Sequence, residues 1–594
     1  MDRNIIMRDY FNTKPETTKL LQDTYREVCV TGHELAIDAL SVDYCIDIVS
    51  NTANIKIINY HNIDKYIDIG FFYYVDENNQ QCVAVNNSDI LHYLLNFTSL
   101  TKRDIKIKLI KTQDFHLILE RNFSHLNVIK SKYLLQFCAS TVTAKNINFL
   151  KVIVGFNLLF FLCLHQSFLF FHLFNNFCYL TQNIFKAFLF KLAITATKNN
   201  AAIAHAHQLS NATKQLPVYS ILVPLYQEVA KLESIIDALR ALDYPKHKLD
   251  VKIVIESDDD PLIDALARCN LPSYIQIIIV PASLPRTKPK ALNYAATYAI
   301  GEYITVYDAE DRPEADQLLK SVAAFQQLPQ EYVCIQAKLN FYNTDENLLT
   351  RFLSIEYIIW FEYLLKGLSI CNFPVPLGGT SNHLKTEILR TIGYWDAYNV
   401  TEDAELGVRL YACGYKTYIL DSYTFEESPI DISTWINQRS RWVKGFIQTF
   451  IIFVICKSKR TTLTLPQVIA TYILIGLSTY SFYCVPWIIV LATISTNTMV
   501  NYLWITNSFF AISYSYSTAL YALKHLKTQH GTNSTFHLLD YLALIIWPLY
   551  FILHSIASYR AMYEIVRSPF FWNKTQHGLS TQNKPPQNTN KAMT

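Results

Sequence analysis

The sequence predicts an α/β domain with a parallel sheet, flanked in the chain by transmembrane α-helices and preceded by a small α/β domain. Three observations support this fold class. Strand-like runs alternate with helical patterns between residues 215 and 445, which is typical of parallel sheets with crossover helices. Long apolar runs precede and follow that region, as membrane spans would. Residues 1–147 have a mixed composition with short alternating stretches.

The composition limits the possible function classes. The chain has 594 residues, which is enough for two to four domains with complete cores. Its formal net charge is only +3, so a nucleic-acid partner that depends on a strong basic field is not expected. The twelve cysteines form no Cys-x-x-Cys pair, so neither a zinc site nor a disulfide framework is predicted. The N-terminus lacks the apolar run of a cleaved signal peptide, and none is expected.

Residues 1–147 predict a soluble accessory domain. The stretches "IKIINY" (55–60) and "DIKIKLI" (104–110) alternate apolar and polar residues as half-buried strands do. The region is weakly similar to the N-terminal domain of type II secretion ATPases, and this resemblance implies a small α/β module. The ATPase motif GxxxxGK(S/T) occurs nowhere in the chain, so we expect an accessory or regulatory role.

Residues 148–196 predict one or two transmembrane helices. The run 152–174 contains no Asp, Glu, Lys or Arg and is about long enough to cross a bilayer. The run 177–194 holds Lys186 near its middle, where a charge costs about 3 kcal/mol on insertion scales. This second run therefore either crosses with the lysine reaching toward the interface or lies at the interface itself.

The region 215–445 contains four strand-like runs separated by helical patterns. The strands are expected at "YSILVPL" (219–225), "VKIVIES" (251–257), "IQIIIV" (275–280) and "YITVYD" (303–308). The helices between them are expected at about 228–241, 261–268 and 288–300. In open sheets of this kind, ligands bind beyond the carboxyl ends of the strands. Acidic residues follow the second and fourth strands directly, so these strand ends are the first place to look for chemistry.

Membrane character returns after residue 445. The run at 446–456 is too short to span and predicts an interfacial helix. About three transmembrane helices are expected within 467–560, at 467–492, 500–523 and 537–558, and the polar tail 572–594 is expected to be disordered. The basic residues of "CKSKRTT" (456–462) follow the α/β region, which places that region in the cytoplasm of a multi-pass inner-membrane protein.

The first acid cluster is the strand end "VYDAED". Asp308 and Glu310 are two residues apart and so share one side of an extended chain. Such hard oxygen donors suit Mg²⁺ or Mn²⁺, which usually bind through one or two carboxylates plus substrate phosphates. A solvated turn is the alternative, because acidic strand ends are common, and this motif alone does not decide between them.

The second acid cluster begins a helix. Thr401 is expected to cap its N-terminus, with Glu402 and Asp403 in the first turn, where the helix dipole favours negative charge. One interpretation is a general base that faces a cleft. The other is a capped helix without chemistry.

A third element is "INQRSRWVKG" (436–445). Gln438 and Arg441 are three apart and share one helix face, with Trp442 beside them. The tryptophan suits stacking on a sugar ring, and the arginine suits a diphosphate leaving group. A membrane-interface helix is the alternative, since Trp and Arg are frequent there.

The order and spacing of these elements resemble those of membrane-bound family 2 glycosyltransferases, a group that includes cellulose, hyaluronan and β-glucan synthases. Their series is D, DxD, TED and QxxRW within a GT-A fold, the α/β fold of nucleotide-diphospho-sugar transferases. Here the series reads Glu256/Asp258, Asp308-Ala-Glu310, Thr401-Glu402-Asp403 and Gln438-x-x-Arg441-Trp442. Supporting matches are "VPLYQE" (223–228) and "KPKALNYA" (288–295). The resemblance covers roughly residues 215–450.

The resemblance implies a role for each matched residue. On the donor side, the nucleotide-sugar would be bound by Tyr226, Glu228, Glu256, Asp258 and Lys290, with the lysine near the diphosphate. The metal, Mg²⁺ or Mn²⁺, would be held by Asp308 and Glu310, with Asp311 as a further ligand. On the acceptor side, Asp403, with Glu402 beside it, would deprotonate the acceptor hydroxyl. Gln438, Arg441 and Trp442 would hold the diphosphate and the end of the acceptor.

Three readings of the function follow. The favoured one is an inverting, processive transfer of a sugar from UDP-glucose or a similar donor to a growing polysaccharide. A single addition to a lipid-linked acceptor and a non-catalytic membrane scaffold are the alternatives. The motif from Gln438 to Trp442 favours the first, since simple single-addition enzymes usually lack it. Two departures matter: Glu256 and Glu310 stand where the family usually has Asp, and "PVPLGGTSN" (374–382) lacks the Cys-Gly pattern of cellulose synthases, which favours a product other than cellulose.

Overall fold

The computed structural model describes a defined set of residues, and the fold is given for these alone. They are 56–57, 71–75, 81–85, 106–110, 131–132, 169–199, 216–455, 462–483, 498–529, 537–572 and 580. The chain divides into two compact units, 1–127 and 128–594, and each is described by itself. Most of the apolar run 152–174 and of the tail 572–594 lies outside the described residues.

The N-terminal unit contains a four-stranded sheet in the order β1-β2-β3-β4. The strands are β1 (Lys56–Ile57), β2 (Phe71–Val75), β3 (Gln81–Val85) and β4 (Lys106–Leu109). The first three pair antiparallel, and β3 pairs parallel with β4. Strands β1 and β4 lie inside the two alternating stretches at 55–60 and 104–110, so both predicted strands are confirmed.

The second unit is built on an eight-stranded sheet in the order β7-β6-β5-β8-β11-β10-β12-β9. The strands are β5 (Tyr219–Leu225), β6 (Leu249–Glu256), β7 (Ile275–Val280), β8 (Tyr303–Val306), β9 (Arg312–Pro313), β10 (Tyr332–Phe341), β11 (Asn382–Lys385) and β12 (Lys416–Glu426). The four strands predicted between 219 and 308 are present as β5 to β8 and pair parallel.

A purely parallel sheet was expected, and this was wrong for the second half. Strand β11 lies antiparallel between β8 and β10, and β9 lies antiparallel on β12. The physical reason is local: β11 has only four residues, and its chain enters the sheet from the edge where β8 ends. Its short, polar sequence "NHLK" gives no periodic signal that would reveal its direction.

Helices cover both faces of this sheet. They are α9 (Leu232–Ala241), α10 (Asp260–Arg268), α11 (Lys288–Ala296), α12 (Gln317–Gln327), α15 (Thr386–Thr391) and α16 (Glu402–Ala412), with short 3₁₀ turns at Val229–Lys231 and Lys246–Lys248. Alternate residues of β5 face opposite sides, as the pleat requires. Ile221 and Val223 pack with α9, α10 and α12, whereas Leu222 packs with α11, α15 and α16. The predicted helices at 228–241, 261–268 and 288–300 correspond to α9, α10 and α11.

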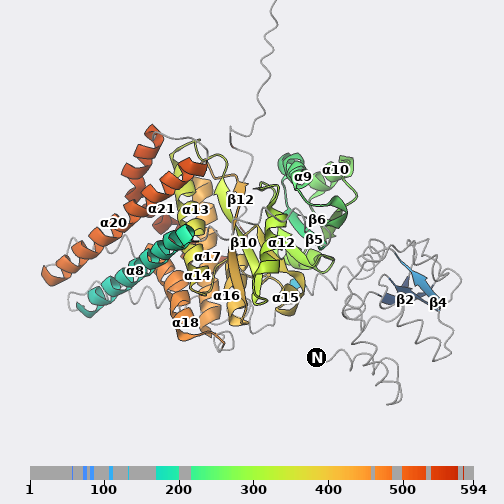
Figure 1. The fold of residues 1–594 in the computed structure, drawn as a ribbon, viewed down its shortest axis with the longest axis horizontal. Helices are drawn as coiled ribbons and strands as arrows, with labels where there is room; N and C mark the ends of the chain where they lie inside the picture. The colour runs from blue at the N-terminus through green and yellow to red at the C-terminus, as the bar shows by residue number, and fades with distance from the viewer. Residues whose placement is uncertain are drawn as a thin grey trace, which may run out of the picture. The chain divides into compact units, whose positions relative to one another are not determined.

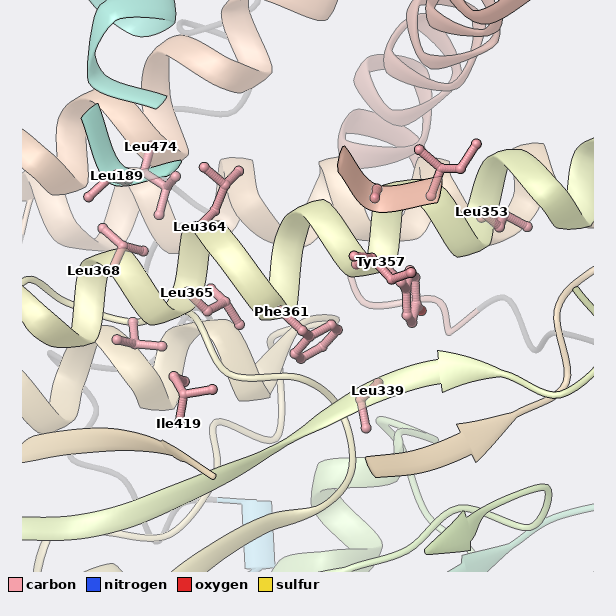
Figure 2. Packing of buried hydrophobic residues seen from close by; sticks show 14 of the residues in the cluster. Leu189, Leu339, Leu353, Tyr357, Phe361, Leu364, Leu365, Leu368, Ile419 and Leu474 are labelled. Carbon is pink, nitrogen blue, oxygen red and sulfur yellow. The ribbon is translucent and has the colours of Figure 1, made fainter. Parts of the chain in front are cut away.

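A third apolar core joins the sheet to the long helices. Between them runs a layer made of α13 (Leu348–Ile358), the π-helical η8 (Ile359–Leu365) and α14 (Lys366–Ile370). Figure 2 shows Leu339 and Ile419 of the sheet on one side of this layer and Leu189 and Leu474 on the other. One continuous buried cluster therefore connects β10 and β12 to the apolar helices.

The long helices are α8 (Leu169–Asn199), α17 (Ile432–Ile455), α18 (Leu465–Thr471), α20 (Thr498–Gln529) and α21 (Leu538–Arg567). Helix α18 continues through the π-helical η10 (Tyr472–Leu477) to residue 483. Helices α8 and α20 lie side by side and extend away from the sheet (Figure 1). Within the described residues, Leu465–Tyr483 and Leu538–Arg567 are long and apolar enough to cross a membrane.

The short interfacial helix predicted at 446–456 is not a separate element. Its residues form the second half of α17, which begins at Ile432 and carries the Gln438–Trp442 motif in its first half. The helix continues without a break because nothing in this stretch stops it: the one glycine, Gly445, is close to Thr401 and no proline occurs.

Candidate active site

A cavity of about 1790 Å³ opens at the carboxyl ends of β5, β6 and β8 and continues between the long helices. Its walls include residues of the loops after these strands and of α8, α17, α20 and α21. Pockets that hold one drug-sized ligand measure about 300–1,000 Å³. The cavity therefore has room for more than one bound sugar nucleotide.

Most of the residues singled out from the sequence line this cavity. They are Tyr226, Glu228, Glu256, Asp308, Glu310, Glu402, Asp403, Gln438, Arg441 and Trp442. Three others are not among the lining residues: Lys290 and Asp311 are buried, and Asp258 is exposed. The structure thus brings together side chains that are as much as two hundred positions apart in the sequence, while their individual roles remain predictions.

Lys290 is paired inside the protein. Its Nζ lies 2.6 Å from Oε1 and 2.8 Å from Oε2 of Glu256, and its side chain is fully buried. Burial raises the pKa of Glu256, and the charge of Lys290 opposes that rise. The other acid of this strand end, Asp258, pairs with Arg286 at 2.5 Å. Lys290 therefore fixes Glu256 in place, and the diphosphate contact predicted for it from the sequence stays a prediction.

Lys288 takes the position at the cavity wall. It is the first residue of α11, and its Nζ lies 2.5 Å from Oδ1 of Asp308 and donates to the Gly379 carbonyl at 2.7 Å. Burial alone would lower its pKa, but the carboxylates of Asp308 and Glu402 outweigh burial and raise it. Residues two positions apart on a helix point to different sides, so Lys288 lies at the cavity wall while Lys290 is buried against Glu256.

Four carboxyl groups crowd the end of β8. Burial and then the Asp308 charge raise the pKa of Glu310 to about 7. Burial, Asp311 and Glu310 raise the pKa of Glu426, at the end of β12, well above its usual range. Glu426 lines the cavity and was missed in the sequence, because no motif marks the end of that strand. The mutual repulsion shows an excess of negative charge that a bound cation would relieve.

The donor set fits a divalent metal ion that is completed by its substrate. Asp311 accepts the backbone N–H of Asp308 at 2.7 Å and the Thr380 hydroxyl through Oδ2, and its buried Oδ1 has no hydrogen-bond partner. Asp311 thus shapes the loop, which leaves Asp308 and Glu310 as the exposed donors. In the described part of the chain, no three His, Cys, Asp or Glu side chains form a ready-made metal cage. Mg²⁺ usually binds through one or two carboxylates together with phosphate and water oxygens.

The second acid cluster starts α16. Asp403 accepts the Ala404 N–H through Oδ1 at 2.7 Å. Burial raises the pKa of Asp403, and the Lys288 and Arg441 charges oppose the rise. Burial and then Asp403 raise the pKa of Glu402 to about 8.

Thr401 occupies the N-cap position but does not cap the helix. Its hydroxyl donates to Oδ1 of Asn399 at 3.3 Å, and its own N–H donates to the same oxygen at 2.9 Å. The expected cap is therefore wrong. The reason is tertiary: the Thr401 side chain packs directly on Gly445 of α17, where an added Cβ would collide with it. Thr401 thus joins the start of α16 to the helix that carries the third motif.

Helix α17 presents Arg441 and Trp442 to the cavity. Arg441 is half-buried, donates to the Val400 carbonyl at 3.4 Å, and lies 4.5 Å from the ring centre of Trp572. The Trp442 ring lies 4.2 Å from the Arg439 guanidinium and 6.1 Å from the Tyr357 ring. The amide oxygen of Gln438 is buried without a hydrogen-bond partner. Neither Arg439 nor Trp572 was singled out from the sequence, because Trp572 is far away in the chain and Arg439 reads as part of a basic helix.

Comparisons with known proteins agree with this geometry. The model of "Glycosyl transferase family 2" matches residues 220–379, and that of "Glycosyl transferase family group 2" matches residues 303–523. A relative from Bacillus subtilis (strain 168), named "Probable glycosyltransferase YdaM", is 29% identical over 240 residues, which is 39% of this chain and 56% of the relative. The chain thus matches little more than half the length of that relative.

Two solved structures show a looser likeness. The mannosyltransferase PcManGT from Pyrobaculum calidifontis, in complex with GDP-Man and Mn²⁺, has 18% identity and a TM-score of 0.40, and the match covers 65% of this chain and 99% of that one. S. aureus TarS 1–349 in complex with UDP-GlcNAc has 14% identity and a TM-score of 0.28, covering 61% and 97%.

Proposed function

The chain carries glycosyltransferase family 2 domains, and from that premise we propose an inverting, processive transfer of a sugar from a nucleotide-diphosphate sugar to a growing polysaccharide at the inner membrane. UDP-glucose or a similar donor is the proposed substrate. The observation that supports this best is one cavity that joins both acid clusters to Trp442 and then to the long helices.

On the donor side, Asp308 and Glu310 would hold Mg²⁺ or Mn²⁺. When bound, this cation supplies positive charge that stabilises the diphosphate as it leaves. Lys288, which lies against Asp308, takes the place proposed for Lys290 and donates a further charged hydrogen bond to the diphosphate. Tyr226 and Glu228, in the loop after β5, line the cavity where the nucleoside would lie.

On the acceptor side, Asp403 is the proposed base. As the acceptor oxygen attacks the anomeric carbon, its proton passes to an Asp403 carboxylate oxygen, and the bond from that carbon to the diphosphate breaks on the opposite face. This in-line displacement inverts the anomeric configuration. Lys288 and Arg441 oppose the rise that burial causes in the pKa of Asp403, so both favour the ionised carboxylate, the form that can accept the proton.

The extension of the cavity supports a polymeric product. Beyond Trp442 the walls combine indole rings with small polar side chains, a lining that suits the faces and hydroxyls of sugars. The residues are Ser478, Trp504, Asn507, Ser515, Thr518 and Trp547. A single-addition enzyme needs room for one sugar and an acceptor end, whereas this cavity exceeds the usual ligand pocket by a wide margin.

The surfaces of the long helices support the membrane location. Large apolar side chains are exposed along α8 and α20, including Phe177, Ile184, Tyr502, Ile505 and Phe509. Soluble monomers rarely expose a continuous apolar surface of this kind. The cytoplasmic side for the catalytic region, and the accessory role of residues 1–147, are part of the same proposal.

Membranes that contain the protein would be given radiolabelled UDP-glucose, UDP-N-acetylglucosamine or GDP-mannose with Mg²⁺ or Mn²⁺, and the products sized. A long ethanol-insoluble polymer that disappears in Asp403→Asn is the expected result. A single-sugar lipid would favour the transferase with a lipid-linked acceptor instead. Equal and negligible turnover in wild type and variant, with every donor, would favour a non-catalytic scaffold.

A further inference from the structure

The beginning of α21 is held by the α/β region. Asp540 is fully buried, and its Oδ2 lies 2.8 Å from Nζ of Lys527. Its Oδ1 lies 3.4 Å from Nε of Arg351 in α13, the helix that follows β10. Arg351 also pairs with Asp345, which is largely exposed. The first turn of α21 is therefore held by ion pairs to α13, the helix next to β10, and to the last turn of α20.

The end of α21 returns to the same region. Glu564 lies 3.2 Å from Nζ of Lys444 in α17. Just after the helix, the Phe571 carbonyl accepts from Lys444 and the Pro569 carbonyl accepts from Gln448, both at 2.9 Å. Trp572 then lies on the Arg441 guanidinium. The C-terminal end thus lies beside the proposed catalytic groups.

Between its ends, one face of α21 packs on α13 and α17. The Tyr550 hydroxyl donates to Glu356 at 2.6 Å and accepts from Trp435 at 3.2 Å, and its ring lies 4.9 Å from Phe352. The helix has 30 residues, about 45 Å at 1.5 Å per residue. A helix of that length that crossed the roughly 30 Å hydrocarbon core would have one end on the far side. Both ends of α21 instead contact the α/β region.

The opposite face of α21 is apolar and exposed. Its residues recur every three or four positions and so form one stripe. They are Leu538, Tyr541, Leu542, Ile545, Leu549, Ile552, Ile556, Tyr563 and Val566. Arg560 is exposed near its C-terminal end, where it pairs with Glu564, whereas Arg567 lines the cavity.

We infer that α21 lies in the plane of the membrane interface, on the leaflet that faces the α/β domain, with this stripe among the lipid headgroups and upper acyl chains. An apolar stripe of this kind is what an interfacial helix buries at the boundary between lipid headgroups and acyl chains. The third span expected from the sequence, 537–558, is therefore an interfacial helix. The inference rests on the membrane location proposed above.

The test uses sealed vesicles of both orientations that contain the full chain with Leu538→Cys or Val566→Cys. A membrane-impermeant maleimide labels them from one side, and peptide mass spectrometry locates the label. The exposed native Cys413 marks the side of the α/β domain. Met499→Cys is the matched control, because it lies exposed at the start of α20, whose other end pairs with α21.

Both α21 cysteines are expected to label from the Cys413 side, and Met499→Cys from the other. Label on Leu538→Cys and Val566→Cys from opposite sides would overturn the inference. If Met499→Cys and Cys413 label from the same side, the membrane location itself fails, which is a different outcome. A spin label at Leu549→Cys gives a second measurement: a depth of about 5–10 Å is expected, whereas about 15 Å, the bilayer centre, contradicts it.

Discussion

Lys288→Met removes the cation that lies between the two acid clusters while keeping most of the apolar length of the side chain. In the structure its Nζ lies 2.5 Å from Asp308 and 2.7 Å from the Gly379 carbonyl, at the cavity wall. If this group donates to the departing diphosphate, its loss resembles the loss of one oxyanion donor, about 2.7–4 kcal/mol, or roughly 10²–10³ in kcat. Little of this loss should appear as reduced stability, because Asp308 remains partly exposed to water.

Lys290→Met is the matched comparison, two positions away in the same helix. It leaves Glu256 buried without its partner, and breaking a buried pair in this way costs about 3–5 kcal/mol of folding free energy. The expected pattern is a large fall in kcat with normal thermal stability for Lys288→Met, and a large fall in stability for Lys290→Met. Transfer rates per folded molecule and unfolding in detergent measure both. The opposite pattern would show that Lys290 is the diphosphate ligand and would refute the reasoning from position.

Three further predictions concern other parts of the domain. Burial lowers the pKa of His383 to about 3, against about 6.5 in the unfolded chain. Between these two pH values the unfolded state binds more protons than the folded state. The free energy of unfolding therefore falls by about 1.4 kcal/mol for each pH unit between 6.5 and 3 as the pH is lowered. Thermal unfolding of wild type and His383→Gln at pH 7.5 and pH 5 should show a smaller loss of stability between the two pH values in the variant. An equal loss in both proteins would contradict the prediction. Gly445→Ala forces a Cβ against Thr401, so it should lower the free energy of unfolding by about 1–3 kcal/mol and reduce transfer activity. The double variant that adds Thr401→Ser should recover part of both, and full activity of the single variant would contradict the contact. Glu426→Gln removes one of the four crowded carboxyl groups, so the Mn²⁺ concentration for half-maximal transfer should rise by about 10-fold or more. An unchanged Mn²⁺ concentration would show that Glu426 does not affect metal binding.

The strands and crossover helices of the first half of the sheet could be predicted from the sequence because their apolar periodicity is strong. The runs that became β5 and β7 match the predicted bounds. Which lysine of α11 reaches the cavity could not be predicted, because the direction of a side chain depends on the residue at which α11 starts. A shift of two residues in that start would place Lys290 where Lys288 now lies.

Other features depend on contacts between distant segments. The pairing of Arg441 with Trp572 and the approach of Glu426 to Asp311 arise only when the chain has folded, and no local pattern encodes them. The same holds for α21: its hydropathy suits a crossing helix, and only the ion pairs at its two ends reveal where those ends lie.

The reversed strand β11 changes what the active-site edge is made of. Parallel strands offer this edge their carboxyl ends, whereas an antiparallel strand offers the segment that precedes it. That segment supplies the Gly379 carbonyl to Lys288 and the Thr380 hydroxyl to Asp311. The groups that hold Lys288 and Asp311 here are therefore a main-chain carbonyl and one threonine hydroxyl, rather than large side chains. Substitutions at the ends of β5, β6 and β12 would therefore leave these two contacts, and with them the positions of Lys288 and Asp311, unchanged.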